Sequence, residues 1–297
     1  MPHALLIVNP AAGRGAAARC EDRVARAFRS HGWTVDVART SAPGHGVVLG
    51  ERAGTDGVGH VVAVGGDGTV HEVANGLLRA GSAAALGVVP IGSGNDFAKL
   101  VRVYRHSPEK AVARLVTAGR WRFDVGRVLG EYFVNSMGFG FGPAVVRLRD
   151  AMPGLRGFLS YLVPVIRAFG TFRPPTLALT SAEHRETGAM MMIEVCNGTT
   201  AGGDYKFAPA ADPCDGCLDV CLVRRVSLPR FLRAIPRVMR GTHVGMREVG
   251  SFQTRSLTVR CPDAPLLLHL DGELREPGVH ECTVTVAPQR LNVMVAR

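Results

Sequence analysis

The stretch that most constrains the fold is residues 61–80, VVAVGGDGTVHEVANGLLRA. Residues 61–64 are apolar and mostly β-branched, as in a strand that is buried in a parallel sheet. The apolar residues further along recur at the spacing of an amphipathic helix. Between the two, Gly65, Gly66 and Gly68 carry no Cβ, which permits close backbone approach or a positive φ. The pattern predicts a glycine-rich turn that joins the end of a strand to the start of a helix.

Such a turn is a natural cradle for phosphate. Its backbone N–H groups and the positive end of the helix point to the same place. Asp67 lies inside the turn, where a bare carboxylate would repel phosphates unless it holds Mg²⁺ or polarises a network around a metal. Taken alone, GGDG fits a phosphate site and a merely structural turn equally well. In the structural interpretation the turn is strained and its aspartate is solvated, so other parts of the sequence are needed to choose.

Two more glycine-rich turns follow predicted strands. Residues 5–8 are apolar and end in NPAAGRG, residues 9–15, where a proline blocks helix continuation and two glycines free the backbone. Residues 86–89 end in PIGSGNDFA, residues 90–98. Ligands of a parallel sheet bind beyond the carboxyl ends of its strands, where all three turns are expected.

The first 120 residues alternate between strands and helices. Another strand is predicted over residues 33–38, and helices are predicted up to residue 30, after residue 43, after residue 69 and over residues 107–118. The alternation predicts an α/β domain with a parallel sheet and helices on both of its faces.

After residue 120 the chain changes to short strands separated by turns, which predicts an antiparallel sandwich or barrel. Two apolar segments, residues 155–169 and 228–240, are predicted as helices that pack against the sheet or form a lip for an acyl chain. The domains are expected to join near residues 120–130, and the last strand to return to the first domain. The predicted strands are residues 123–128, 131–136, 176–180, 190–196, 218–223, 256–260, 266–270, 282–286 and 291–295.

The net charge of +10 favours anionic partners such as acidic lipid surfaces and phosphate-bearing ligands. Lysine occurs only at Lys99, Lys110 and Lys206, so nearly all the positive charge is arginine, which a coding bias would explain equally well. No RNA- or DNA-binding motif accompanies the charge, and no nucleic-acid partner is expected.

Seven cysteines and an N-terminus without a signal-peptide pattern predict a reduced, cytoplasmic protein. Cys214, Cys217 and Cys221 form a CxxCxxxC run with Cys196 as a fourth candidate zinc ligand, but no second CxxC or His pair stands nearby. No apolar run reaches the ~18 residues that span a bilayer, and the best candidate is residues 158–166. A protein that acts on lipids would therefore have to visit the membrane surface.

The glycine turns suit a nucleotide, but two familiar nucleotide-binding patterns are missing. The chain contains no GxxxxGK[ST] P-loop, and no GxGxxG opens a helix with an acidic residue after the next strand. Asp67, Asp96 and Asp124 fall at predicted strand ends or turns near one edge of the sheet. Together with water, these acids could hold the Mg²⁺ that phosphoryl transfer requires.

Five motifs in order resemble the diacylglycerol kinase catalytic-domain family, which includes bacterial lipid kinases, eukaryotic diacylglycerol kinases, sphingosine kinases and ceramide kinase. The resemblance spans Asn9 to Glu273. It implies an N-terminal α/β domain like those of phosphofructokinase and NAD kinase, and a C-terminal antiparallel β-sandwich. The motifs are NPAAGRG, GGDGT, PIGSGNDFA, DG-x-LDV and LDGE.

The resemblance also implies where the substrates bind. Residues 1–124, completed by residues 288–297, would bind ATP, and residues 125–287 would bind the lipid. Either Asp271 or Glu273 would be the general base on the acceptor hydroxyl, with Asp67 also in the catalytic set. The implied nucleotide contacts are Asn9, Pro10, Ala11, Ala12, Gly13, Thr40, Gly65, Gly66, Asp67, Gly68, Thr69, Ser93 and Asn95.

Bacterial members of that family carry a second, structural Mg²⁺ beside the DG-x-LDV loop. By position, Asp215 would be a side-chain ligand, with Asp212 and the carbonyl of Cys217 contributing. This assignment would explain the cysteine run without zinc. Two positions depart from the family pattern: Ser93 replaces the usual threonine, and Gly142 stands where many diacylglycerol kinases have aspartate, which argues against a strict diacylglycerol specialist.

We therefore expect an ATP-dependent, Mg²⁺-requiring kinase for a hydroxyl of diacylglycerol or a related glycerolipid. It would be cytoplasmic and make transient contact with the inner membrane surface. A soluble small-molecule kinase like NAD kinase is one alternative, and a nucleotide- or lipid-binding protein without turnover is another. The sequence names neither the lipid nor the oligomeric state, and a homodimer is compatible with it.

Overall fold

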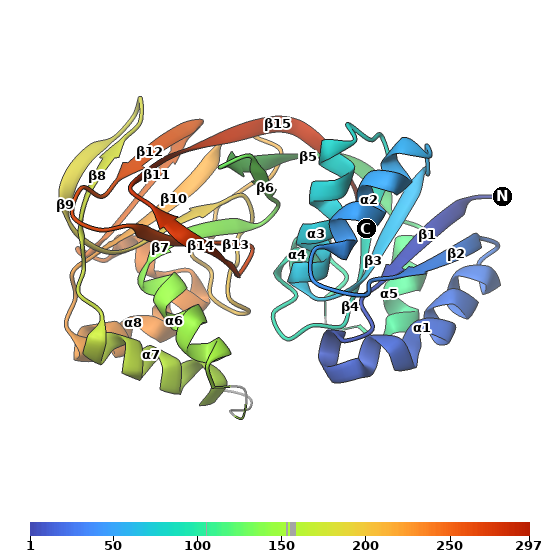
Figure 1. Ribbon diagram of the computed structural model, residues 1–297, viewed down its shortest axis with the longest axis horizontal. Helices are drawn as coiled ribbons and strands as arrows, with labels where there is room; N and C mark the ends of the chain where they lie inside the picture. The colour runs from blue at the N-terminus through green and yellow to red at the C-terminus, as the bar shows by residue number, and fades with distance from the viewer. Residues whose placement is uncertain (105, 153, 155–158) are drawn as a thin grey trace. The chain divides into compact units, whose positions relative to one another are not determined.

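The computed structural model describes residues 1–104, 106–152, 154 and 159–297, and the chain divides into two compact units (Figure 1). The first unit consists of Met1–Val125, Glu131–Val134 and Ala287–Arg297. The second unit consists of Gly126–Gly130 and Asn135–Val286.

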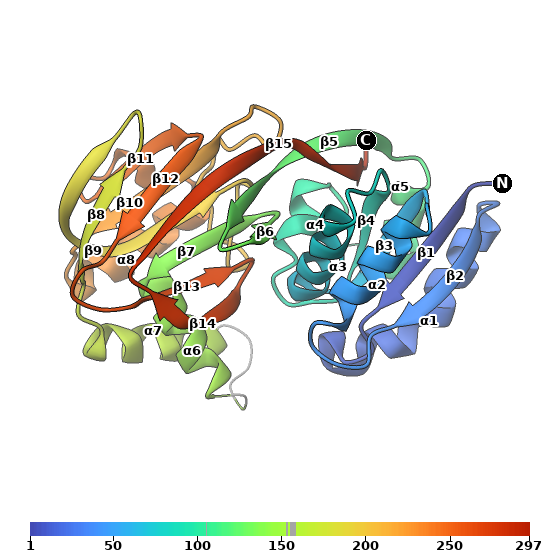
Figure 2. The same cartoon turned by 45° about the horizontal axis from the view of Figure 1, so that its top comes forward.

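The first unit is built on a parallel sheet. Its strands are β1 (His3–Val8), β2 (Thr34–Arg39), β3 (His60–Gly65) and β4 (Ala85–Pro90), in the order β4-β3-β1-β2. Figure 2 shows these four strands side by side. The end of the last strand, β15 (Glu281–Val295), adds to the sheet beside β4, also in parallel. The four strands predicted from apolar runs are confirmed, and the chain end does return to this sheet.

The helices of this unit cover both faces of the sheet, and the strand order determines which helices share a face. They are α1 (Ala12–Ser30), α2 (His45–Thr55), α3 (Asp67–Arg79), α4 (Asp96–Leu100) and α5 (Pro108–Leu115). Right-handed crossovers put α1 on one face and α2 and α3 on the other, because the chain reverses direction along the sheet after β2. Helix α1 packs with α5, and α2 packs with α3. The predicted two-faced α/β arrangement is therefore confirmed.

The packing of α2 against α3 depends on glycine. A Cβ on Gly76 would lie 2.2 Å from the carbonyl oxygen of Val47, and one on Gly50 would lie 2.6 Å from that of Val73. The two helix backbones therefore approach more closely than any side chain would allow. The short helix α4 was not predicted, because five residues are too few for an apolar period to show.

The pairs formed by strands β7 to β14 of the second unit are antiparallel. Strand β9 (Arg185–Cys196) takes part in two sheets: its first half pairs with β8 and its second half pairs with β7 and β10. This arrangement confirms the predicted β-sandwich. The other strands are β5 (Gly119–Val128), β6 (Glu131–Phe133), β7 (Ser136–Gly140), β8 (Thr176–Thr180), β10 (Leu218–Arg224), β11 (Val249–Thr254), β12 (Ser256–Arg260), β13 (Leu266–Leu270) and β14 (Glu273–Val279). Of these, β6 and the part of β5 up to Val125 belong to the first unit.

Three helices of this unit pack on one apolar cluster. They are α6 (Phe141–Asp150), α7 (Leu159–Thr171) and α8 (Leu228–Arg240), followed by a single 3₁₀ turn at His243–Gly245. Buried Phe141, Ala168, Met191 and Met192 form the centre of the cluster. The helix expected over residues 155–169 is confirmed from Leu159 onward, and its first four residues lie outside the described residues.

Several sequence predictions of strands and helices were wrong in detail. The strand expected over residues 131–136 is two strands, β6 and β7, and those expected over residues 282–286 and 291–295 are the single strand β15. Helix α6 was missed because glycine and proline in GFGPA hid its period, and β14 because ELREPGV does not alternate. Strand β11 was also missed. No helix among the described residues is long and apolar enough to cross a bilayer.

Candidate functional site

The three glycine turns of the first unit touch one another beyond the strand ends. A Cβ on Gly13, whose φ is +58°, would lie 2.5 Å from the carbonyl oxygen of Ile91. A Cβ on Gly92 would lie 2.6 Å from the Cα of Gly66. The turn after β4 is therefore in backbone contact with the turns after β1 and β3, at the sheet edge that the sequence indicated.

Two glycines of the GGDGT turn, Gly65 and Gly66, lie where a side chain would be crowded. Gly66 has extended backbone angles, with φ −97° and ψ −169°, and α3 begins at the next residue. A Cβ on Gly65 would lie 2.3 Å from Oγ1 of Thr69. The sequence allowed two reasons for these glycines, close backbone approach or a positive φ. None of Gly65, Gly66 and Gly68 has a positive φ, so close approach is the reason for Gly65 and Gly66.

Asn9 joins the first turn to the GGDGT turn. Its Nδ2 donates to Oγ1 of Thr69 at 3.2 Å, and its Oδ1 accepts from the N–H of Ala11 at 3.1 Å. Its own N–H donates to the carbonyl oxygen of Val64. Thr40, which follows β2, donates its N–H to the carbonyl oxygen of Val8 at 2.9 Å. The candidate nucleotide contacts from β1, β2 and β3 are therefore neighbours.

Asp67 connects the GGDGT turn to α4. Its Oδ1 accepts the N–H of Phe97 at 3.2 Å. The neighbouring Asp96 is buried and forms an ion pair with Lys99 at 2.9 Å. Asn95 closes the turn after β4, since its side chain both accepts from the N–H of Gly92 and donates to that residue's carbonyl oxygen. The side chain of Asn95 is thus engaged in shaping the loop that carries exposed Ser93.

Asp124 is in a different environment from the other two acids. It is completely buried on β5, and its Oδ1 accepts the N–H of Gln289 on β15 at 2.6 Å. Across the described residues, no group of three or more His, Cys, Asp or Glu side chains is arranged to hold a metal ion. The acids of this unit are oxygen donors of the type that Mg²⁺ takes, and Asp67 and Asp96 start two helices that meet at the Phe97 N–H.

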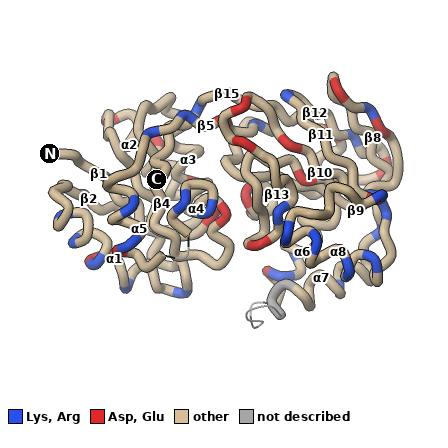
Figure 3. Tube along the Cα trace, turned by 180° about the vertical axis from the view of Figure 1, so that it is seen from behind, with Lys and Arg blue, Asp and Glu red and all other residues tan. Residues whose placement is uncertain are grey.

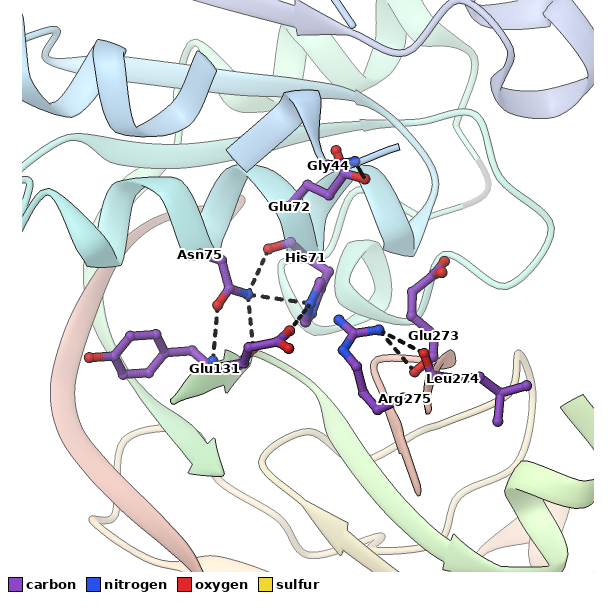
Figure 4. Close-up of polar contacts among 9 residues, drawn as sticks. Gly44, His71, Glu72, Asn75, Glu131, Glu273, Leu274 and Arg275 are labelled. Atoms are coloured by element: carbon purple, nitrogen blue, oxygen red, sulfur yellow. Dashed lines mark hydrogen bonds and ion pairs between the residues drawn. The ribbon is translucent and has the colours of Figure 1, made fainter. Parts of the chain in front are cut away.

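Helix α3 carries polar residues that the sequence analysis missed. The carboxylate of Glu72 accepts the N–H of Gly44 at 2.8 Å (Figure 4). It also accepts the N–H of Gly46 at 2.8 Å, and the two bonds hold the start of α2. Asn75 exchanges two hydrogen bonds of 2.9 Å with the backbone of Tyr132 on β6. Buried His71 lies 3.7 Å from the carboxylate of Glu131. A polar stripe inside an otherwise apolar helix was the signal available in the sequence.

In the second unit, Asp271 and Gly272 form a two-residue hairpin turn between β13 and β14. Both have positive φ, +48° and +86°, as Asp-Gly hairpins require. The Oδ1 of buried Asp271 accepts from the N–H groups of Asn135 and Ser136, at 2.8 and 3.1 Å. This carboxylate therefore holds the start of β7. Glu273 is exposed, and the guanidinium of Arg275 donates to its carbonyl oxygen (Figure 4).

A buried polar group behind this turn was also missed. Oγ of Ser136 donates to Glu194 at 2.9 Å, and Nε2 of His269 lies 3.4 Å from the same carboxylate. Gly138 makes room for the pair, because a Cβ there would lie 2.3 Å from Glu194. At Gly142, a Cβ would be 3.6 Å from Nε2 of His269, an ordinary contact distance. Such long-range groupings leave no pattern in the sequence.

The DG-x-LDV loop collects carboxylates. Oδ1 of Asp212 accepts the N–H of Cys214, and Oδ1 of Asp215 accepts that of Cys217. Gln253 donates to both Asp215 and Asp219. Burial raises the pKa of Asp219, and the negative charges of Asp215 and Asp212 add to that rise. The loop is thus oxygen-rich and short of positive charge.

The cysteine run does not converge on a metal within the described residues. Cys221 is buried, and burial raises its pKa to about 12. Its Sγ lies 3.6 Å from His243. Cys196 is buried too, whereas Cys214 and Cys217 are partly exposed, and none of these cysteines is in a disulfide.

The second unit also contains a cavity of about 410 Å³ between α6, α7 and the segment from Cys261 into β13. Its wall is mostly apolar, with Leu148, Ala168, Phe172 and Leu266 among the residues that line it. A volume of this size is in the range of small-molecule sites.

Comparisons with known proteins agree with this two-part architecture. Residues 3–128 match the model of the diacylglycerol kinase catalytic domain. Residues 135–295 match that of the YegS C-terminal NAD kinase beta sandwich-like domain. A crystal structure of a diacylglycerol kinase from Bacillus anthracis superposes with a TM-score of 0.72, at 20% identity over 99% of this chain and 96% of that one.

Relatives with curated names extend over most of the chain. A diacylglycerol kinase of Bacillus subtilis is 27% identical over 92% of this chain and 90% of its own. A protein of Chromohalobacter salexigens named "Probable lipid kinase YegS-like" is 32% identical over 85% and 81%. The fold and the matched models together define a two-domain kinase-type protein. The chain belongs to the diacylglycerol kinase catalytic-domain family, with a C-terminal domain of the YegS type.

Proposed function

We propose that this protein is an ATP-dependent kinase that phosphorylates a hydroxyl group of a lipid such as diacylglycerol or a related glycerolipid. The observation that carries the proposal is the set of three interlocked glycine turns. A Cβ on Gly13 or Gly92 would overlap neighbouring backbone, and one on Gly66 would be crowded at 3.2 Å from the Cα of Gly92. A surface built of bare peptide groups beside the start of α3 suits the oxygens of a nucleotide phosphate chain.

The nucleotide would bind to the first unit. The backbone of residues 65–69 would receive the phosphates, with Asn9 and Thr69 keeping the first two turns in register through their 3.2 Å hydrogen bond. Pro10, Ala11, Ala12 and Gly13 would line the same surface. Thr40 and Ser93 would complete it, and Asn95 would act by shaping the loop.

Magnesium would accompany the nucleotide and neutralise charge that develops on the transferred phosphoryl group. Asp67 and Asp96 fit a hard cation by donor type, and Asp124 would support them from its buried position on β5. The DG-x-LDV loop would hold a second ion through Asp215, Asp212 and the carbonyl of Cys217. Burial is the main cause of the raised pKa of Asp219, and the negative charges of Asp215 and Asp212, which add to that rise, are what a cation there would offset.

Glu273 is the better candidate for the general base. The carboxylate of Asp271 already accepts two backbone N–H groups and is buried, so it would orient the turn. Glu273 is exposed at the start of β14, where a carboxylate can accept the proton of a bound hydroxyl. We assign proton acceptance to Glu273 and a positioning role to Asp271.

The acceptor would be a lipid, which the protein would meet as a cytoplasmic protein in transient contact with the inner membrane surface. The apolar cavity of about 410 Å³ beside α6 and α7 could take part of an acyl chain. The relatives' names, which refer to diacylglycerol and lipid kinases, support this acceptor class over a nicotinamide nucleotide.

The test is a phosphoryl-transfer assay with the purified full chain, labelled ATP and Mg²⁺. Vesicles would contain diacylglycerol, monoacylglycerol, ceramide or phosphatidylglycerol in parallel, and NAD⁺ would be offered separately. We expect label in an organic-extractable product from at least one lipid. Asp67→Asn should lower the rate by roughly a hundred-fold or more, whereas Asp56→Asn, an exposed control in the same unit, should not.

Label in NADP⁺ instead of lipid would replace the proposal with a nicotinamide kinase. ATP binding without transfer to any acceptor would point to a binding protein without turnover.

A further inference from the structure

The segment around α8 is unusually rich in arginine. From Val220 to Arg247 the chain has no aspartate or glutamate. Figure 3 shows the basic residues of α8 along the trace of the helix. The segment has seven arginines, which are Arg224, Arg225, Arg230, Arg233, Arg237, Arg240 and Arg247.

Two of these arginines are used within the protein. Arg224 pairs with Glu186 at 2.7 Å, and Arg230 pairs with Glu248. The other five have no acidic partner among the described residues, and all five are exposed. An unbalanced group of exposed cations on one segment is a surface to which an anion is attracted.

Apolar side chains are exposed on the same segment. Leu232 and Met239 of α8 are 37% and 44% exposed, and Val244 in the following 3₁₀ turn is 42% exposed. Leu232 and Met239 are seven residues apart, so they lie on the same side of the helix, two turns from each other. We call Leu232, Met239 and Val244 with the five unpaired arginines the α8 surface.

The helix is held so that this surface stays outward. Phe231 packs edge-on against Phe141 of α6 and contacts Phe169 of α7, with ring centroids 5.3 and 5.4 Å apart. Gly241 ends the helix in a left-handed conformation against Pro209. Although its inner side rests on the aromatic cluster, α8 has no fully buried residue within the described range 159–297. Its surface is therefore preformed and open.

We propose that the α8 surface docks the protein on a bilayer that contains anionic lipid. This inference rests on the proposed function, since a kinase for a lipid hydroxyl has to reach its acceptor at a membrane. Arginines would lie at the headgroups while Leu232, Met239 and Val244 enter the boundary with the acyl chains, as in helices that lie in the membrane interface. The mixture of cationic and apolar side chains on one helix favours a charged bilayer over a nucleic acid, which offers no apolar layer.

The experiment measures binding of the full chain to vesicles in the absence of ATP. Vesicles are made of phosphatidylcholine alone or of phosphatidylcholine with phosphatidylglycerol, and bound protein is quantified by flotation. We expect binding only with phosphatidylglycerol, weakened at about 1 M salt relative to about 0.1 M because salt screens exposed charges. The variant Arg233→Gln/Arg237→Gln/Arg240→Gln should bind roughly a hundred-fold more weakly, at about five-fold per arginine.

The matched control is Arg185→Gln/Arg255→Gln/Arg290→Gln, which removes the same charge from exposed arginines on β-strands and their turns. It should bind within about three-fold of the wild type, because none of its three arginines belongs to the α8 surface. A second variant, Leu232→Ser/Met239→Ser, should lose binding at high salt more than at low salt, since it removes only the apolar contribution.

Equal binding of the α8 triple variant and the control would overturn the inference, as would wild-type binding to pure phosphatidylcholine at the same strength. Binding to DNA or to a second copy of the chain without vesicle binding would also reject it. The outcome is separable from the kinase proposal. Vesicle binding without lipid phosphorylation leaves the α8 surface in place, and phosphorylation with undiminished binding of the triple variant rejects the surface alone.

Discussion

The two candidate regions of this protein are built in opposite ways. In the first unit the important surface is backbone, made by removing side chains at Gly13, Gly66 and Gly92. In the second unit the DGE turn depends on side chains, with Asp271 holding β7 and Glu273 left exposed. The difference teaches how each fails: a backbone surface is disrupted by adding an atom, and a carboxylate site by removing a charge.

The largest effect is expected at the exposed carboxylate of the second region. Glu273→Gln should lower kcat by roughly 10²–10⁴-fold, the usual contribution of a general base, while ATP binding stays unchanged. Kinetics at saturating ATP and calorimetric nucleotide binding measure the two quantities. Glu281→Gln, also exposed in the second unit, serves as the control. A Glu273→Gln enzyme with unaltered kcat would move the base to another residue.

Adding one methyl group should damage the backbone region. Gly92→Ala places a Cβ 2.6 Å from the Cα of Gly66. Overpacking of this kind lowers the free energy of unfolding by about 1–3 kcal/mol. Weaker ATP binding should accompany that loss, because the turns are forced apart. Gly59→Ala, whose Cβ would meet nothing within 4 Å, is the control in the same unit. Unchanged nucleotide affinity in Gly92→Ala would separate the interlocked turns from ATP binding.

Asp271→Ala sharpens the contrast within the DGE turn. It leaves the N–H groups of Asn135 and Ser136 without their acceptor, which should cost about 1–3 kcal/mol in the free energy of unfolding. Urea denaturation reports this quantity directly. Asp271→Asn retains an acceptor oxygen and should recover most of the loss. If the alanine variant were as stable as the wild type, the positioning role of Asp271 would be wrong.

The smallest effect concerns the DG-x-LDV loop and depends on pH. Burial raises the pKa of Asp219 in the folded state, so stability from this group is present below the ordinary aspartate pKa and is lost as pH rises through the raised value. Asp219→Asn cannot ionise, and without metal it should be more stable than the wild type at pH 7, by no more than about 0.5 kcal/mol.

At pH values below the ordinary aspartate pKa, the wild type and Asp219→Asn should have equal free energies of unfolding. Urea titrations at pH 7 and near pH 4 give the comparison. A difference that persists unchanged at the lower pH would assign the effect to something other than the charge of Asp219.

Much of the fold could be predicted from the amino-acid sequence. The apolar run 61–64 and the glycines after it predicted the central strand and the start of α3, because both signals come from neighbours in sequence. The motif order identified the family, and the comparisons confirmed it. The elements that escaped prediction, such as α4, α6 and β14, are short or contain glycine and proline, which weakens the local signal.

The sequence by itself determined the strand–turn–helix pattern, the two-part architecture and the acids available for chemistry. Only the tertiary structure decided that Gly66 and Gly92 touch and that Asp271 is committed to Asn135 and Ser136. It also decided that five arginines on and beside α8 have no acidic partner among the described residues. The physical reason is the separation along the chain between the residues that interact. Periodicity and turn preference act between residues close in the chain, whereas contact, burial and charge pairing join residues separated by tens to more than a hundred positions, and these are settled only when the whole chain packs.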